Sequence, residues 1–361
     1  MFAVKNNTFN RQCFSRLFST FFSQLNEIKE KIVILSQSHD IFTNLALEDF
    51  IYSKTTFKEK GMILLVWRSN PCVVIGRHQN PWQEVMVDNC NKNNITVCRR
   101  NSGGGTVFHD LGNINMSFLS SKENYNRKNN LQFISSCLLE KFKVKTVISP
   151  REDLVLESGE KVSGTASKLA SKNSYHHCTL VVNVNLDRMR SAIRKDAIPS
   201  LKSNATTSVR SPVKNLQSIS KEMNAVNCMD SIVDSFVNGD PKRIMTINPV
   251  ESVVPGIQGK TKEFSSWDWI FGKTPRFYLE KELNGEADPF TLKMTIIKGC
   301  VSEFSCQSDS REGLLQLDLK DVRFEPDTVQ EKLLMWSLLE DDIIWSNSVI
   351  KAASSLIKEV F

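Results

Sequence analysis

The sequence has no uninterrupted apolar run near the roughly 20 residues that a membrane-spanning helix needs. We therefore expect a soluble protein that does not enter a membrane. The nine cysteines are dispersed without any Cys-x-x-Cys pair, and the five histidines lack the spacing of zinc ligands. An odd, dispersed set of cysteines argues against a disulfide framework and for a reducing compartment. We also predict no structural metal.

Internal repeats, low-complexity tracts and basic stripes interleaved with aromatic residues are missing as well, and the last absence argues against nucleic-acid binding. The chain has 361 residues, 40% of them hydrophobic, with 21 Phe and 6 Trp. This composition is sufficient to build real cores, and the length predicts about two domains. The mild net charge of +6 suits a phosphate ligand or an acidic partner.

Acidic residues are missing from the first 26 positions, where Lys5, Arg11 and Arg16 occur among Ser, Thr, Asn and Phe. The segment lacks the continuous apolar stretch of a secretory signal. Its composition is typical of a mitochondrial transit peptide, with an N-terminal tail of accidental composition as the alternative. We predict a transit peptide at residues 1–26 and a location in the mitochondrial matrix, and we exclude this segment from the fold.

Hydrophobic periodicity predicts an α+β fold in which helices and strands are interleaved irregularly. The amino-terminal part is expected to contain strands at residues 32–35, 63–67, 72–76, 95–98, 113–119, 154–156 and 179–185. It is expected to contain helices at residues 40–54, 82–93, 131–142, 188–197 and 215–237, with Asp40 capping the first. Residues 200–212 read as irregular. The carboxy-terminal part is expected to form a small antiparallel sheet at residues 276–283, 290–298 and 300–306, followed by two amphipathic helices.

The most informative segment is Arg-Arg-Asn-Ser-Gly-Gly-Gly-Thr-Val-Phe-His-Asp at residues 99–110. Glycine lets a ligand lie directly on the backbone, and the exposed amides of such a loop bind anions or carbonyl oxygens. The arginines add planar cationic groups suited to phosphate. An ordinary glycine-rich turn between strands is the alternative if the motif is considered alone.

Three further segments accompany this motif: residues 76–82, residues 151–168 with Lys-Val-Ser-Gly-Thr-Ala-Ser-Lys at 161–168, and residues 175–179. In this order and spacing they resemble the lipoate–protein ligase A family, and within it the mitochondrial lipoyltransferases of animals. The resemblance runs from about residue 32 to the end. It implies a large mixed-sheet acyltransferase domain of the lipoate/biotin ligase type at residues 27–250 and a small C-terminal α+β domain at residues 251–361.

The resemblance also implies a lipoyl-adenylate site. Its apolar slot for the acyl chain is expected from Val73, Val74, Ile75, Val107 and Phe108. Its lipoyl-AMP-binding residues are expected to be Arg100, Ser102, Gly103, Gly104, Gly105, Phe108, Arg151, Lys161, Thr179, Thr206, Ser208 and Val209. Its supporting residues are expected to be His78, Asp153, His177 and Cys178.

Lys161 is the predicted catalytic residue. A lysine between the acyl carbonyl and the phosphate stabilises both the oxyanion and the departing AMP. The alternative for this residue, a solvated surface lysine in a charged hairpin, loses weight inside the Lys-x-Ser-Gly-Thr-Ala motif. His109 and Asp110 are either a base with its orienting carboxylate or a structural cap on the glycine loop.

Cys178 is a departure from the bacterial ligases, which usually have glycine at this position, whereas the animal enzymes resemble this chain. A thiol near the acyl site suggests a thioester relay. The alternative is a small buried hydrophobic residue at a strand.

The resemblance implies transfer of a lipoyl group to a specific lysine of the lipoyl domains in E2 subunits of 2-oxoacid dehydrogenases. The expected donor is lipoyl-AMP or the lipoylated H protein of the glycine cleavage system, and the enzyme is expected to act as a monomer. One alternative is a complete lipoate–protein ligase that uses Mg-ATP. The other is a non-catalytic acyl-nucleotide binding module. The Gly-Arg-Gly-Arg type loop of biotin ligases is absent from the sequence.

Overall fold

The computed structural model describes residues 25–284, 289–308, 315–317, 319–338 and 343–361. The predicted transit peptide at residues 1–26 lies, except for its last two residues, outside this part of the chain. Every helix in the described part is too short or too polar to cross a lipid bilayer.

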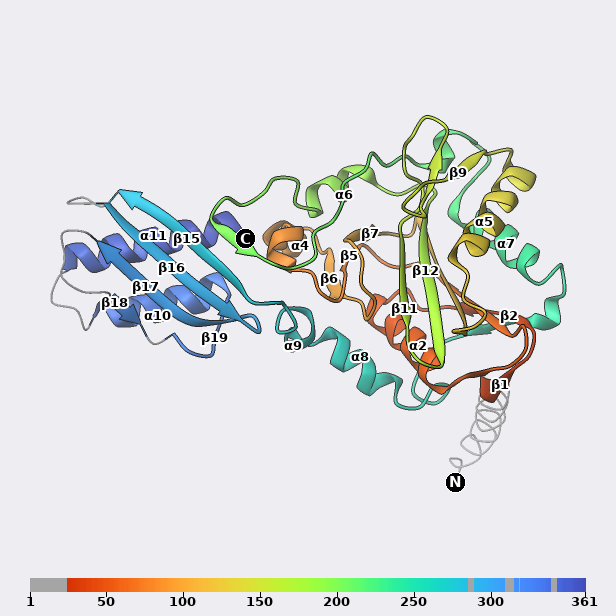
Figure 1. The fold of residues 1–361 in the computed structure, drawn as a ribbon, viewed down its shortest axis with the longest axis horizontal. Helices are drawn as coiled ribbons and strands as arrows, with labels where there is room; N and C mark the ends of the chain where they lie inside the picture. The colour runs from red at the N-terminus through yellow and green to blue at the C-terminus, as the bar shows by residue number, and fades with distance from the viewer. Residues whose placement is uncertain (1–24, 285–288, 309–314, 318, 339–342) are drawn as a thin grey trace, which may run out of the picture.

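A six-stranded mixed sheet lies at the centre of the larger part of the molecule (Figure 1). In spatial order its strands are β11 (Thr165–Leu169), β12 (Asn173–Val181), β8 (Asn113–Ser121), β4 (Met62–Trp67), β2 (Lys31–Ser36) and β14 (Ile244–Ile247). Strand β2 pairs in parallel with β4 and β14, and the other neighbours are antiparallel. The sheet brings the segments around residues 67, 115 and 179 side by side.

The strand predicted at residues 179–185 is in fact β12, which begins at Asn173 and ends at Val181. It pairs with β8 along its whole length, so the ladder sets its bounds. The amides of Val182 and Val184 bond instead to a loop carbonyl and to an asparagine side chain. The predicted strand extended too far because Val182 and Val184 are buried β-branched residues, which are typical of a strand even outside the ladder.

Helices cover both faces of this sheet. Helices α5 (Arg127–Phe142) and α7 (Ala225–Phe236) share one core with its strands, whereas α2 (Ile41–Lys54) and α8 (Ile257–Ser265) share the core on the other face. The predicted cap of the first helix is confirmed, because the Asp40 carboxylate accepts a 2.7 Å hydrogen bond from the amide of Thr43. Two small pairs of strands lie outside the main sheet: β1 (Glu27–Ile28) with β3 (Thr56–Phe57), and β9 (Thr146–Ile148) with β10 (Leu154–Leu156).

Three predicted helices are shorter than the sequence pattern indicates. The helix expected at residues 82–93 divides into α3 (Pro81–Glu84) and α4 (Val87–Lys92), since Val85 is extended between them. The helix expected at 188–197 is α6 (Leu186–Ala192). The one expected at 215–237 contains only a 3₁₀ turn and α7, because a capping box at Asn224 starts a new helix.

A three-stranded sheet packs beside the main one, in the order β6 (Thr96–Arg99), β5 (Cys72–Ile75) and β7 (Val107–His109). Successive side chains of a strand point to opposite faces. Val73 and Phe108 therefore pack into the core shared with the carboxy-terminal part, while Val74 and Val107 face the other way. This alternation decides which residues reach the site described below.

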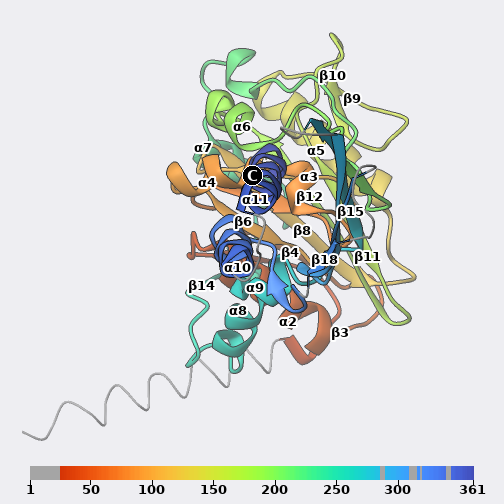
Figure 2. The same cartoon turned by 90° about the vertical axis from the view of Figure 1, so that its left-hand side faces the viewer.

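The carboxy-terminal part is an antiparallel sheet with two helices, and it lies at one end of the molecule (Figures 1 and 2). Its strands are β15 (Phe277–Asn284), β16 (Pro289–Ile297), β17 (Cys300–Ser308), β18 (Leu315–Leu317) and β19 (Val322–Arg323), and its helices are α10 (Pro326–Ser337) and α11 (Ile343–Val360). The expected strands and both expected helices are thus confirmed. The sheet also contains β13 (Leu201–Ser203), which pairs with β15, although this segment was predicted to be irregular.

The two parts are joined by helices α8 and α9 (Trp267–Ile270) and by a continuous core. Trp82 lies at the junction, with its ring centroid 5.3 Å from those of Phe271 and Phe277 and 5.2 Å from that of Phe324. Because α8 packs against α2, the chain just after residue 250 belongs to the core of the larger part. The domain limits of 27–250 and 251–361 remain predictions.

Candidate functional site

A cavity of about 320 Å³ lies between the main sheet and the three-stranded sheet. Trp67 on β4, Asn115 on β8 and Thr179 on β12 are cross-strand neighbours, so their side chains share one face of the main sheet. Val74 on β5 and Val107 on β7 form a matching pair on the other sheet. All five line the cavity, which is therefore enclosed by side chains from two sheets.

Most of the predicted site residues converge on this cavity. Those on its wall are Arg100, Gly104, Gly105, Arg151, Asp153, Lys161, His177, Cys178, Thr179, Thr206, Ser208 and Val209. The structure does not place Ser102, Gly103, Phe108 or His78 there. The His78 ring is exposed, and the residue contributes only its carbonyl, which accepts a hydrogen bond from the amide of Thr206.

Phe108 differs from most predicted site residues in lying away from the cavity. It lies in the core next to the carboxy-terminal sheet, together with Val73 and Ile75 from the expected acyl slot. The alternation along β5 and β7 turns these three side chains away from the cavity, and only Val74 and Val107 of the expected slot remain on its wall. The sequence could not reveal which of the two alternating sets of side chains on each strand faces the cavity.

The glycine-rich loop is held in place by Arg100. Its guanidinium is buried and donates to the carbonyls of Gly103 at 2.6 Å, Gly105 at 2.7 Å and Val74 at 3.0 Å. Burial lowers the pKa of Arg100 to about 10, so the side chain stays charged at neutral pH. Because its guanidinium is bonded to loop carbonyls, Arg100 holds the conformation of the loop and is not free to bind a phosphate through those same groups.

The close approach of two glycines explains the tightness of this loop. A Cβ at Gly76 would lie 2.1 Å from the carbonyl oxygen of Gly104, and Gly104 itself has a φ of +87°. Neither position accepts a side chain without a backbone shift. The loop therefore lies directly on the end of β5.

Arg99, whose guanidinium the sequence suggested as suited to phosphate, anchors the start of the loop instead. Its fully buried guanidinium donates to carbonyl oxygens on both sides, including Gln79 at 2.8 Å and Ile270 at 2.6 Å, and to the hydroxyl of Thr274 at 3.0 Å. In return Trp269 Nε1 donates to the Arg99 carbonyl at 2.8 Å. Arg99 thus fixes the strand before the loop to helix α9 and the segment that follows it.

Lys161 lines the cavity with its ammonium 2.8 Å from Asp153 Oδ2. Its backbone bridges Val155 on one side and Val213 on the other, so both neighbouring segments fix its position. Thr165 donates to the second oxygen of Asp153 at 3.3 Å. The lysine is therefore oriented by a carboxylate rather than left in solvent, as the charged-hairpin alternative would require.

A hydrogen-bonded chain connects the loop to helix α2. Ser102 Oγ lies 2.8 Å from His177 Nε2, and His177 Nδ1 lies 3.1 Å from Glu48 Oε1. Ser102 and Glu48 are buried, whereas His177 reaches the cavity wall. Ser102 thus acts on the site through His177 rather than by contact.

The segment at residues 206–209 forms the outer wall and is pinned by Glu84. One Glu84 oxygen accepts from the Ser208 amide at 3.0 Å, and the other is bonded to the Ser208 hydroxyl. The same hydroxyl accepts from the amide of Thr106 at 2.8 Å and from Gln79 Nε2 at 3.0 Å. This network joins the outer wall to the glycine loop.

Several buried polar atoms on the cavity wall find no hydrogen-bond partner among the described residues: Trp67 Nε1, Asn115 Nδ2 and both ring nitrogens of His109. Burial lowers the pKa of His109 to about 3, so the ring is neutral near pH 7. Asp110 bonds instead to the amides of Gly112 and Asn185, both at 2.8 Å. This geometry argues against a base oriented by Asp110, because the Asp110 carboxylate bonds to backbone amides and not to the His109 ring.

Sequence reasoning missed Glu48, Glu84 and Arg127. Arg127 lines the cavity from the first turn of α5 and forms a 2.6 Å ion pair with Glu152. All three are single charged residues on helices, so only their spatial neighbours reveal their contacts with the site. Gln79, by contrast, lies inside the motif at residues 76–82. Within the described residues, no group of three or more His, Cys, Asp or Glu side chains could hold a metal ion.

Although Cys178 borders the cavity, its side chain packs in the core on the opposite face of the main sheet, with residues of α5 and α7. Burial raises the pKa of its thiol well above the usual range, so a thiolate is disfavoured. We expect Cys178→Ala to retain acyl transfer, because the geometry favours the packing role. Single-turnover transfer to an apo lipoyl domain checks this, and a loss of transfer in a folded variant would restore the thioester relay.

Comparison with known proteins agrees with this arrangement. Residues 40–237 match the family model of the lipoyl protein ligase A/B catalytic domain, which is more than half of the chain. The chain belongs to this family. It is 36% identical to the mitochondrial lipoyl amidotransferase LIPT1 of Homo sapiens, over 81% of this chain and 80% of the human protein. It is 32% identical to the lipoate-protein ligase A of Psychrobacter cryohalolentis, over 80% of this chain and 87% of that one.

Solved structures show the same fold. The crystal structure of Plasmodium falciparum LipL1 in complex with lipoate covers 90% of this chain and 100% of its own, with a TM-score of 0.59 and 22% identity. This family member is therefore an α+β protein with the ligase fold and a small C-terminal domain. Its kinship with lipoyl amidotransferases and lipoate–protein ligases makes it an acyltransferase that transfers lipoyl groups.

Proposed function

We propose that this enzyme transfers a lipoyl group from lipoyl-AMP, or from the lipoylated H protein of the glycine cleavage system, to a specific lysine in the lipoyl domains of E2 subunits. The observation that carries the proposal is the mixed lining of one cavity. Apolar side chains such as Leu45 and Val107 share its wall with the cations Lys161, Arg127 and Arg151. An acyl adenylate has the same two halves, an apolar chain and an anionic phosphate.

In the proposed reaction the neutral ε-amine of the acceptor lysine attacks the acyl carbonyl carbon. The bond from this carbon to the phosphate oxygen then breaks, AMP leaves with its electron pair, and the amine loses a proton. Lys161 supplies positive charge to the carbonyl oxygen and to the departing phosphate, while Asp153 keeps its ammonium in place. Enclosure between two sheets lowers the access of water to the acyl group.

The proposed partners and location rest on the relatives. The human relative is named mitochondrial, and a similar solved structure is described as part of an archaeal lipoylation system, a bipartite lipoate protein ligase and its E2 lipoyl domain from Thermoplasma acidophilum. We infer a location in the mitochondrial matrix and a monomeric enzyme. The net charge of +6 favours encounter with lipoyl domains, which are generally acidic.

The test is single-turnover transfer to an apo lipoyl domain with three donors in parallel: synthetic lipoyl-AMP, lipoyl-H protein, and free lipoate with Mg-ATP. Transfer from the first two alone supports an amidotransferase. Efficient use of free lipoate and Mg-ATP identifies a complete ligase instead. Absence of transfer from all three would overturn the proposal in favour of a non-catalytic binding module.

A further inference from the structure

Two consecutive carboxylates of helix α2 are linked to two consecutive residues of the glycine-rich loop, one directly and one through His177. Asp49 Oδ1 accepts a 2.7 Å hydrogen bond from Asn101 Nδ2. Glu48 reaches Ser102 through the His177 ring described above. The loop is therefore attached to α2 at two successive positions, immediately before its three glycines.

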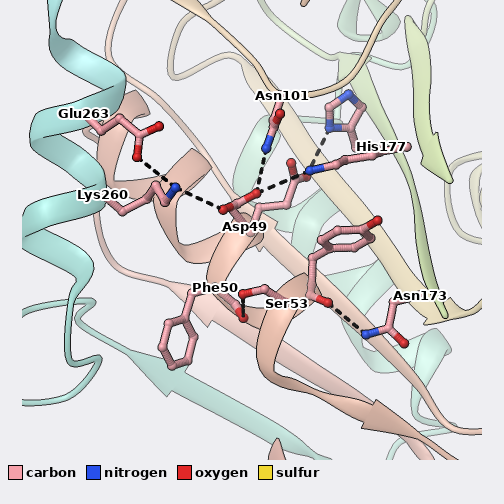
Figure 3. Close-up of polar contacts among 11 residues, drawn as sticks. Asp49, Phe50, Ser53, Asn101, Asn173, His177, Lys260 and Glu263 are labelled. Carbon is pink, nitrogen blue, oxygen red and sulfur yellow. Dashed lines mark hydrogen bonds and ion pairs between the residues drawn. The ribbon is translucent and has the colours of Figure 1, made fainter. Parts of the chain in front are cut away.

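Asp49 also meets two lysines from other elements, one of which, Lys260, is labelled in Figure 3. Lys260 extends from helix α8 to within 3.6 Å of Asp49 Oδ2, and Lys168 at the end of β11 lies 3.5 Å from Oδ1. Lys260 is itself paired with Glu263 at 2.8 Å. The Asp49 side chain is 16% exposed, so these charges act on a largely desolvated carboxylate.

This position matters because the three glycines that follow cannot fix the loop by themselves. Three consecutive glycines supply no side chains for packing and leave the backbone free to adopt many conformations. Arg100 holds the carbonyls of Gly103 and Gly105, and Ser102 is bonded to Arg77 and Arg100, but these bonds do not restrain the Asn101 side chain. The Asn101–Asp49 bond supplies that restraint from α2.

We propose that Asp49 is a positioning residue of the transfer reaction, one that acts through Asn101 to set the glycine-loop amides against the acyl adenylate. Lys260 extends the same contact to α8, the helix that leads toward the carboxy-terminal sheet. The inference rests on the proposed function, since the loop is taken to bind lipoyl-AMP. A loop that binds substrate and transition state alike affects KM more than kcat.

The experiment compares Asp49→Leu, Asp49→Asn and Asn101→Ala with the control Glu263→Gln. This control alters a neighbour of Lys260 that does not touch the loop. We expect Asp49→Leu and Asn101→Ala to raise the KM for lipoyl-AMP about tenfold with little change in kcat, because each removes one charge-assisted hydrogen bond. Asp49→Asn keeps an acceptor for Asn101 and is expected to recover most of this loss.

Amide hydrogen exchange at residues 101–106 gives a second readout that does not depend on turnover. We expect faster exchange there in Asp49→Leu and Asn101→Ala, and wild-type exchange in Glu263→Gln. Wild-type KM and exchange in Asn101→Ala would overturn the inference, even if Asp49→Leu fails to fold. Failure of the wild-type enzyme to transfer from any donor would instead refute the proposed function, and the exchange data would still report whether Asp49 orders the loop.

Discussion

Lys161→Ala is expected to lower the single-turnover rate of transfer from lipoyl-AMP by about 10²–10³-fold, the usual effect of removing one donor to an oxyanion. Asp153 and the backbone bridges on both sides of Lys161 fix its ammonium on the cavity wall. Among the described residues, no other lysine lines this wall and could replace it. The rate is measured with saturating enzyme and an apo lipoyl domain.

Lys214→Ala is the matched control. Lys214 follows the segment that bridges Lys161, but its ammonium pairs with Glu160 at 3.2 Å and does not line the cavity. We expect this variant to transfer at close to the wild-type rate. A Lys161→Ala enzyme that is folded and transfers within a few-fold of wild type would remove Lys161 from the proposed mechanism.

Arg99→Met is expected to lower the free energy of unfolding by on the order of 3 kcal/mol. The substitution keeps an apolar stem but leaves several buried carbonyls without donors, and each such group costs about 1–3 kcal/mol. Burial lowers the pKa of Arg99 to about 9, which still leaves it charged at neutral pH and bonded to uncharged acceptors. Urea unfolding followed by tryptophan fluorescence measures the change.

Arg68→Met serves as the comparison. Arg68 makes an exposed 3.3 Å hydrogen bond to the Leu111 carbonyl, so its removal is expected to cost less than about 0.5 kcal/mol. Equal stability of the Arg99 and Arg68 variants would show that the buried guanidinium adds little to the attachment of the loop.

The sequence was sufficient to find the parts of the site that are contiguous. Residues 99–105 and 161–168 carry glycines and cations in a dense pattern, and the structure brings both segments to one cavity. Periodicity likewise located the carboxy-terminal sheet and its two helices. In each of these cases the signal is local, so a single chain is enough to reveal it.

The other residues of the site are placed by contacts between residues far apart in the chain, which the sequence alone does not reveal. Glu84 meets Ser208 across 124 positions, and His177 meets Glu48 across 129. A lone glutamate on a helix has the same local pattern whether it is solvated or buried against such a partner. Phe108 points away from the cavity for a different reason, because the neighbouring sheet sets which face of a strand lines the cavity.

The pairing of β13 with β15 has a genetic consequence. Residues 201–203 lie just before the outer wall of the cavity, and their hydrogen-bonding partner comes from the carboxy-terminal sheet. A premature stop codon after residue 250 would preserve every residue that lines the cavity. It would nevertheless deprive β13 of its neighbour and Arg99 of Ile270 and Thr274. Late truncating alleles are therefore expected to be null rather than mild.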